Sequence, residues 1–231
     1  MKIKNPEKRL EGFWGKVDKK HIHTIEKFLY GKNIFDMGCG YGTTTSQITA
    51  LGYNCIGIDY DTSAINAAKK RFPNCTFQFA NAEVLPFEDG YFDTIILRDA
   101  LHHFYREANF EKVKSEILRV SKKKSRIIFF DPNINFILKT MRKISFHQDQ
   151  ECNFETAVEI MKGFDYKIIH SSFNTIYSLP LSGGYVGINF VPNINSVHSI
   201  ILFSEKILER AINKIHLGRY FCWRYILAGE R

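Results

Sequence analysis

Residues 34–42 read Ile-Phe-Asp-Met-Gly-Cys-Gly-Tyr-Gly and are followed by the hydroxyl run 43–46. Apolar residues around one acid predict a short buried strand, and three alternating glycines predict a turn that a ligand approaches closely. Residues 43–51 can then form a helix whose first free N–H groups point back at that ligand. A strand, a glycine turn and a helix in this order are typical of a nucleotide-type binding site.

The composition sets the class of protein. The chain has 231 residues, 45% hydrophobic and 24% charged, so we expect one domain with one sizeable core. The five cysteines are scattered and form no C-x-x-C pair, so neither a disulfide framework nor a zinc knuckle is expected, and we predict no metal. The charged start has no signal-peptide core and no apolar run reaches 18 residues, which predicts a cytoplasmic protein.

The net charge of +8 is unevenly distributed. Residues 1–32 hold nine Lys/Arg against four Asp/Glu, residues 33–131 twelve of each, and residues 132–231 eleven against eight. The central segment is therefore neutral and the excess positive charge lies in the two ends. A solvated charged surface is favoured there over a specific anionic partner.

Apolar strands alternate with helices in the first half of the chain. After the opening motif we expect strands at 54–59, 75–80, 91–97 and 127–130, and helices at 61–71, capped by Asp61, and 110–120. Such a pattern requires a parallel sheet covered on both faces, with ligands at the carboxyl ends of the strands. Asp59, Asp131 and the turns 81–83 and 97–99 all fall at strand ends and are expected to face one crevice.

The two ends are less regular. An amphipathic helix is expected at 17–30, preceded by Phe13-Trp14 in a polar arm as either a hydrophobic plug or a lid over the ligand. Beyond residue 133 the pattern predicts a short helix at 135–144, a helix at 154–163 capped by Asn153, a strand at 166–173, a helix at 197–217 with its apolar residues on one face, and a closing strand at 220–227.

Five motifs in order resemble the class I S-adenosylmethionine-dependent methyltransferases, specifically the small-molecule branch that includes enzymes of quinone and natural-product biosynthesis. They are residues 36–42, Asp59, residues 81–87, residues 92–93 with 100–104, and residues 116–120. The resemblance implies an α/β fold: a Rossmann-like, doubly wound, mostly parallel seven-stranded sheet with the last strand antiparallel, in a single domain with helical cap elements. It divides the chain into a basic arm and helix (1–32), a cofactor-binding core (33–133) and variable substrate-side elements with the closing strands (134–231).

The resemblance also implies the cofactor S-adenosylmethionine, with S-adenosylhomocysteine as its product. Glycine amides would approach its amino-acid part, and a carboxylate at Asp59 would accept both ribose hydroxyls. Asn81 stands where the family usually has Asp, so it brings no charge. The residues expected to bind the cofactor are Asp36, Gly38, Cys39, Gly40, Gly42, Thr43, Asp59, Tyr60, Asn81, Ala82, Glu83, Leu97 and Arg98.

The candidates for a catalytic base are His102, His103 and Asp99. Imidazole titrates near neutrality and could take a proton from a phenol, hydroxyl or amine. A base is needed only if the acceptor still carries its proton at attack. A structural role for the histidine pair is favoured over a catalytic one.

Other functions compete with methyl transfer. A nicotinamide oxidoreductase needs G-x-G-x-x-G, whereas here the third glycine comes one residue early. A cofactor-binding domain without activity is a further alternative. Nucleic-acid methylation is not favoured, because residues 98–101 lack the Pro-Pro turn of the exocyclic-amine enzymes and the chain has no Pro-Cys nucleophile.

The methyl acceptor is predicted to be a small, hydrophobic molecule chosen by the variable segments. The apolar helix 197–217 would line its pocket or lie on a membrane, where Lys206, Arg210 and Lys214 form a basic ridge. Glu205 and Glu209 argue against that membrane contact, so packing on the core or on a second subunit is favoured. The oligomeric state is left open.

Overall fold

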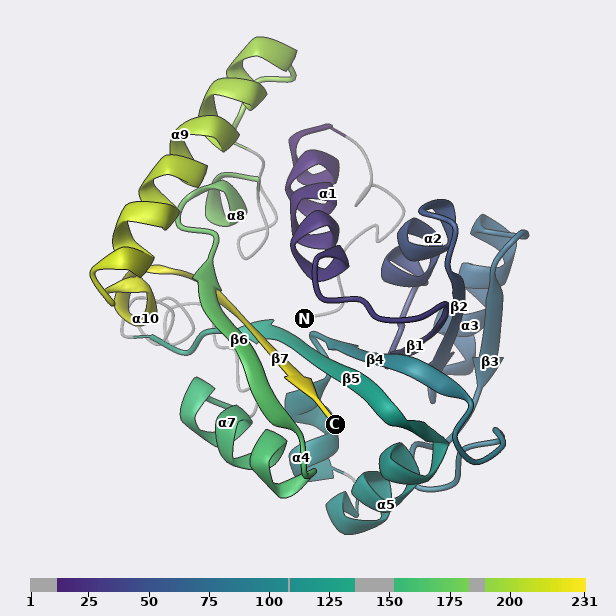
Figure 1. Cartoon of the computed structure of the whole chain (residues 1–231). Helices are drawn as coiled ribbons and strands as arrows, with labels where there is room; N and C mark the ends of the chain where they lie inside the picture. The colour runs from purple at the N-terminus through teal and green to yellow at the C-terminus, as the bar shows by residue number, and fades with distance from the viewer. Residues whose placement is uncertain (1–11, 108, 136–151, 183–189) are drawn as a thin grey trace. The chain divides into compact units, whose positions relative to one another are not determined.

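Seven strands form one sheet in the order β3-β2-β1-β4-β5-β7-β6 (Figure 1). The computed structural model describes residues 12–107, 109–135, 152–182 and 190–231. Six strands run parallel and β7 is antiparallel, which confirms the predicted fold class. The strands are β1 (Asn33–Met37), β2 (Asn54–Asp59), β3 (Thr76–Phe79), β4 (Phe92–Arg98), β5 (Ser121–Pro132), β6 (Lys167–Asn174) and β7 (Arg224–Glu230).

The central strands are buried on both faces, as their largely apolar sequences predicted. Every residue of β4 is buried, and β1 buries all but its first residue. Phe35 of β1 stacks on Phe92 of β4 with ring centroids 4.6 Å apart, and Phe87 packs edge-on against both rings. Helices α4, α5 and α7 lie below the sheet in the view of Figure 1 and α2 lies above it.

Two of the predicted helices begin at a capping side chain. Asp61 accepts the N–H groups of Ser63 and Ala64, and Asn153 accepts that of Thr156, so both predicted N-caps are confirmed. The helices are α1 (Gly12–Glu26), α2 (Thr43–Ala50), α3 (Thr62–Arg71), α4 (Leu101–Glu107), α5 (Phe110–Val120), α7 (Phe154–Gly163), α8 (Ser178–Leu181), α9 (Asn195–Lys214) and α10 (Gly218–Phe221).

The described residues group into two compact units. Unit 1 holds residues 12–24, 132–135, 172–182 and 190–225, and unit 2 holds residues 25–107, 109–131, 152–171 and 226–231. Unit 2 contains β1 to β5 with α2, α3, α4, α5 and α7, whereas unit 1 contains α8, α9, α10 and most of α1. The expectation of a single domain stays a prediction.

Several predicted boundaries were wrong. Helix α1 begins at Gly12 rather than at residue 17, so Phe13 lies inside it and packs in unit 1 against Val17 and Val191, as a hydrophobic plug would. The closing strand begins at Arg224, because Gly218–Phe221 forms α10. The helix expected at 135–144 lies outside the described residues after position 135.

Helix α9 buries only part of the apolar face that the sequence predicted. Val197 and Ile201 of its apolar set do pack inward, but Ile200, Ile207 and Ile215 are exposed. The buried residues of the helix are instead polar: His198, Glu205 and Glu209. Among the described residues, the length and apolar content needed to cross a bilayer are found in no helix.

Candidate functional site

Five parallel strands of unit 2 end at one edge of the sheet. The register pairs Met37 with Ile58 and Arg98 with Phe130, so the chain leaves these strands at neighbouring points. Asp59, the last residue of β2, pairs with Phe79 at the end of β3. The polar residues at this edge are Asp59, Asn81, Asp99 and Asp131, as the strand pattern predicted.

The glycine turn between β1 and α2 has three residues with left-handed backbone angles. Gly38, Gly40 and Gly42 have φ of 78°, 51° and 77°, a region that favours glycine. A Cβ at Gly38 would lie 2.8 Å from Ala100, and one at Gly42 would lie 2.5 Å from Phe77. A Cβ at Gly40 would meet none of the described atoms within 4 Å. Packing therefore excludes side chains at two of the glycines, while the third faces open space.

Asp59 is held beside that open space by backbone amides. One carboxylate oxygen accepts the N–H of Gly40 at 2.8 Å, and the other accepts the N–H of Asp61 at 2.9 Å. Each oxygen keeps a lone pair for a further donor. Because Asp61 caps α3, as predicted, Asp59 is not needed for that role. The carboxylate is half-buried and oriented, as a binding group for two hydroxyls should be.

Asp36 is the buried acid beneath the turn. Its carboxylate accepts the hydroxyl of Thr45 at 2.6 Å, and Arg98 lies nearby, donating to Thr44 at 3.3 Å. Burial raises the pKa of Asp36 to about 6, although the Thr45 hydroxyl and the Arg98 charge oppose the shift. Asp36 and Arg98 are thus enclosed partners at the base of the site.

The other predicted cofactor residues differ in exposure. Cys39 and Thr43 are buried in the turn and the first turn of α2, and burial strongly raises the pKa of the Cys39 thiol. Leu97 and Ala82 are buried as well. Tyr60 is exposed, as an aromatic that stacks on a ligand from outside would be.

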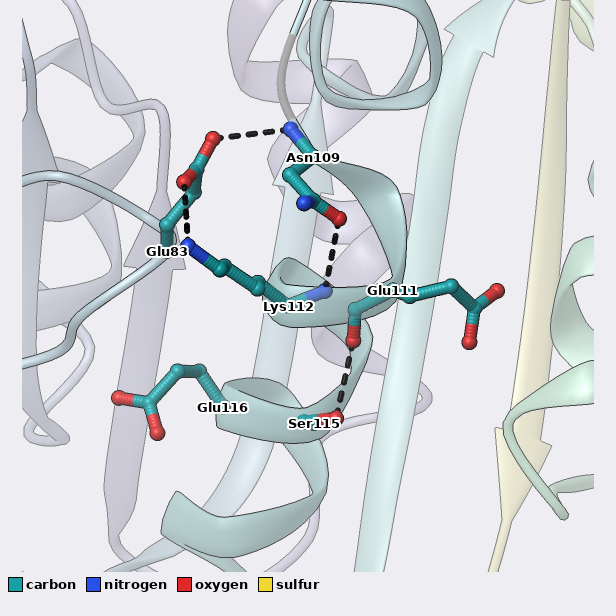
Figure 2. Close-up of a pocket in the computed structure, with 6 residues that line it drawn as sticks. All are labelled: Glu83, Asn109, Glu111, Lys112, Ser115 and Glu116. Atoms are coloured by element: carbon teal, nitrogen blue, oxygen red, sulfur yellow. Dashed lines mark hydrogen bonds and ion pairs between the residues drawn. The ribbon is translucent and has the colours of Figure 1, made fainter.

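The 81–83 turn is fixed partly to α5. Asn81 accepts the N–H of Glu83 at 2.9 Å through its side-chain oxygen. Glu83 accepts the N–H of Asn109 at 2.8 Å and pairs with Lys112 at 3.9 Å, as Figure 2 shows. The Glu83 carboxylate is therefore committed to α5, although it was predicted to bind the cofactor. Its partners line a shallow depression on α5 together with Glu111, Ser115 and Glu116.

Arg119 fixes the rest of this loop. Its guanidinium donates to the carbonyls of Leu85 and Phe87 and to the carboxylates of Glu116 and Asp89. Glu116 also accepts the N–H of Leu85 at 2.6 Å. The motif at 116–120 thus has a physical role, because it holds the loop that follows β3 in place. Glu116 is also one of the residues that line the depression shown in Figure 2.

The predicted catalytic residues lie after β4. Asp99 has a φ of 56°, an unusual angle for a non-glycine residue, which turns the chain into α4. The rings of His102 and His103 lie 4.2 Å apart between centroids. The structure places one more residue here, Asp131, to which the sequence assigned no catalytic role. Nδ1 of His102 lies 3.7 Å from Oδ1 of Asp131.

Asp131 is an unusual carboxylate. Its side chain is 1% exposed, and among the described residues neither of its oxygens accepts a hydrogen bond. A buried carboxylate is costly unless a charged or donating group faces it, and His102 is the group found in that position. The sequence signal was an acid at the end of the fifth strand, but only the fold brings it to the histidine.

Residues 35–129 match the methyltransferase domain family. The uncharacterized methyltransferase YcgJ of Bacillus subtilis is 34% identical over 103 residues, which cover 42% of this chain and 40% of that protein. Demethylmenaquinone methyltransferase of Renibacterium salmoninarum is 26% identical over 98 residues, which cover 42% of this chain and 40% of that protein. The chain thus spans about two-fifths of the length of these curated relatives.

The fold has solved counterparts. The crystal structure of geranyl diphosphate C-methyltransferase from Streptomyces coelicolor A3(2) gives a TM-score of 0.67 at 11% identity, over 99% of this chain and 88% of that chain. At this identity the likeness establishes the fold alone. Residues 35–129 thus belong to the methyltransferase domain family, and the seven-stranded sheet has the fold of the class I S-adenosylmethionine-dependent methyltransferases.

Proposed function

We propose that this chain binds S-adenosylmethionine at the glycine turn and transfers its methyl group to a small, hydrophobic acceptor. The observation that carries the proposal is the open space at Gly40, where the described atoms leave room for a ligand next to the oriented carboxylate of Asp59. A turn without side chains and an adjacent acid suit the amino-acid part and the ribose of this cofactor.

The residues that would hold the cofactor follow from their placement. The amides of the glycine turn and of Thr43 at the start of α2 would meet its charged end, with Asp36 and Arg98 buried beneath. Asp59 would accept from the ribose hydroxyls through its remaining lone pairs. The adenine would lie near Tyr60, Asn81, Ala82 and Leu97, with Cys39 packed behind the turn. Glu83 would act through the loop rather than by contact.

When bound, S-adenosylmethionine supplies an electrophilic methyl group on a sulfonium. The protein then has to hold the acceptor in line and exclude water. His102 would take the acceptor's proton through Nε2, while Asp131 faces Nδ1 and orients the ring. His103 would pack against His102, and Asp99 would turn the chain so that both imidazoles reach the site.

The nature of the acceptor rests on a relative. A demethylmenaquinone methyltransferase matches 42% of this chain, and its name gives demethylmenaquinone as its acceptor. We place this chain in the same class of chemistry without naming its acceptor. A cytoplasmic location, expected from the scattered cysteines, belongs to this proposal. No nucleic-acid partner is proposed.

Calorimetry with S-adenosylmethionine and S-adenosylhomocysteine tests the proposal on the full chain. Binding of both, lost in Asp59→Ala, is expected. Binding of neither would overturn the assignment. A second assay would follow transfer of labelled methyl from S-adenosylmethionine to demethylmenaquinone in detergent. Cofactor binding without transfer to this probe would redirect the search to other hydrophobic acceptors.

The alternative is a domain that binds the cofactor and has no activity. No described atom lies within 4 Å of a Cβ built at Gly40, so the described residues do not block the cofactor space next to Asp59. Nothing in the site favours this alternative. It would show itself as cofactor affinity that survives unchanged in His102→Ala, with no methyl transfer to any acceptor by either protein.

A further inference from the structure

Helix α9 of unit 1 packs Val197 and Ile201 inward together with polar residues, but it leaves a further set of large apolar side chains exposed. Ile200 and Phe203 are each 67% exposed, Ile207 53% and Ile215 61%. At i, i+3 and i+7 spacing, Ile200, Phe203 and Ile207 share one face of the helix. Large apolar side chains exposed together on one helix mark a surface that contacts something else.

A buried polar network fixes this orientation. Glu205 accepts the N–H groups of Ile176, Tyr177 and Ser178 through one oxygen and pairs with Lys20 through the other. Glu209 accepts the N–H of Thr175 and pairs with the same lysine at 2.7 Å. Rotating the helix to bury its exposed apolar side chains would leave the carboxylates of Glu205 and Glu209 buried without their hydrogen-bond and ion-pair partners. The exposed face is therefore the stable arrangement of unit 1.

The same network removes the acidic residues from the outer surface. Lys206, Arg210 and Lys214 recur every four residues beside the apolar face, are exposed, and form no ion pair with any described residue. The acids of α9, Glu205 and Glu209, point inward to Lys20. The outward side of α9 thus carries three positive charges and no negative one, next to a band of Ile and Phe.

We propose that this outward side of α9, called the α9 face (Ile200, Phe203, Lys206, Ile207, Arg210 and Lys214), binds the surface of an anionic lipid bilayer. An amphipathic helix with large apolar side chains and flanking Lys/Arg is the element that lies in such an interface. Anionic headgroups complement the basic stripe, and acyl chains cover the apolar band. Tyr220 and Phe221 of α10, which follows α9 in the chain, are exposed as well.

Charge decides between a bilayer and a second copy of the chain. Two α9 faces packed together would bring three positive charges against three, with no exposed acid on either helix to compensate. Residues 132–231, which include α9, also hold more Lys/Arg than Asp/Glu. An anionic bilayer has the complementary sign throughout.

Vesicle flotation with the full chain tests the proposal without the cofactor, so its outcome is separate from that of the proposed function. The probes are vesicles of phosphatidylcholine with one-third phosphatidylglycerol, and vesicles of phosphatidylcholine alone. The wild type is expected to float with the anionic vesicles and to stay unbound with the neutral ones. The triple variant Lys206→Gln/Arg210→Gln/Lys214→Gln should lose about a hundredfold in partitioning, and Phe203→Ser/Ile207→Ser at least tenfold.

Two matched controls make the same changes elsewhere. Lys69→Gln/Lys70→Gln/Lys123→Gln removes three exposed charges, and Leu51→Ser/Ile169→Ser removes two exposed apolar side chains. Both should bind as the wild type does, and all variants should keep the wild-type melting temperature because they alter exposed positions. The proposal fails if the wild type does not float, or if the control and α9 variants lose equal amounts. A concentration-dependent mass in light scattering that Phe203→Ser/Ile207→Ser abolishes would assign the face to a second copy instead.

Discussion

Nδ1 of His102 lies 3.7 Å from Oδ1 of Asp131, a carboxylate that is buried at the end of β5. This separation is longer than a hydrogen bond, and such contacts often tighten only when a substrate is bound. The two residues come from neighbouring strand ends, which the parallel register of β4 and β5 brings together. An imidazole next to a carboxylate is the combination expected of a general base, here His102, and the residue that orients it, here Asp131.

Asp131→Asn should slow methyl transfer while leaving the affinity for S-adenosylmethionine unchanged. The acid is expected to favour the tautomer with the proton on Nδ1, so the variant should also alter the ¹⁵N shifts of the His102 ring. His102→Ala should cost about 10²–10⁴ in turnover. His103→Ala, in which the neighbouring ring is removed, is the control and should cost far less. Equal losses in both alanine variants would return the pair to a structural role.

Asp59→Asn should weaken binding of S-adenosylmethionine about tenfold to a hundredfold, because a charge-assisted hydrogen bond is worth about 1.5–3 kcal/mol. Asp61→Ala is the matched control two residues away. It removes the cap of α3 and should lower the free energy of unfolding by about 1 kcal/mol without changing cofactor affinity. Calorimetry and urea titration measure the two effects. A loss of affinity in Asp61→Ala alone would contradict the assignment of Asp59.

The glycines of the turn should separate stability from binding. Gly42→Ala drives a Cβ to 2.5 Å from Phe77 and should lower the free energy of unfolding by more than about 2 kcal/mol. Gly40→Ala meets no described atom within 4 Å, so only its left-handed φ costs, about 1 kcal/mol. Its methyl group nevertheless enters the proposed cofactor space, and cofactor binding should be lost. A Gly40→Ala protein with wild-type affinity would place the cofactor elsewhere.

The sheet was predictable because its signals are local. The apolar runs of β1 and β4, the glycine turn and the cap at Asp61 are each set by a few adjacent residues. The orientation of α9 was not predictable in this way. Its periodicity favours burial of the isoleucines. Glu205 and Glu209 are buried instead, because they form ion pairs with Lys20, which is distant in sequence.

Contacts between distant segments also decided the details of the site. Glu83 lies in a motif that predicted cofactor binding, but its carboxylate accepts the N–H of Asn109 and pairs with Lys112. Asp131 was visible as an acid at a strand end, but its partner depends on the pairing of β4 with β5. The start of α1 was missed because Gly12 interrupts the pattern, while the burial of Phe13 depends on Val191.

Asp36 should give the protein an unusual dependence of stability on pH. Its folded pKa of about 6 lies above the unfolded value of about 3.9, so the folded state favours the neutral acid. Stability therefore falls as pH rises from about 4 through 6, by on the order of 2–3 kcal/mol for this group. Asp36→Asn mimics the neutral form and should be more stable than the wild type at pH 8 and equal to it near pH 4.

Asp93 is the control, because its pKa is shifted in the opposite direction from that of Asp36. Burial acts to raise its pKa, but Lys122 and the N–H groups of Asn33 and Lys32 lower it overall. Asp93→Asn should therefore be less stable than the wild type at pH 7, and the difference should shrink as pH falls through the folded pKa. Urea titrations across this range measure both variants. If the stability of both variants relative to the wild type changed with pH in the same direction, the burial of a neutral Asp36 would be contradicted.

Lys20 is the cation on which the polar interior of unit 1 depends. Burial acts to lower its pKa, but Glu205 and Glu209 outweigh that effect and raise it, so the ammonium stays charged between them. Lys20→Met would leave two buried carboxylates without their cation and should lower the free energy of unfolding by about 3–5 kcal/mol. Lys16→Met, which removes an exposed hydrogen bond to Asn195, should change it by less than about 0.5 kcal/mol. Thermal and urea unfolding compare the two, and similar small losses would mean that backbone N–H donors alone stabilise the carboxylates.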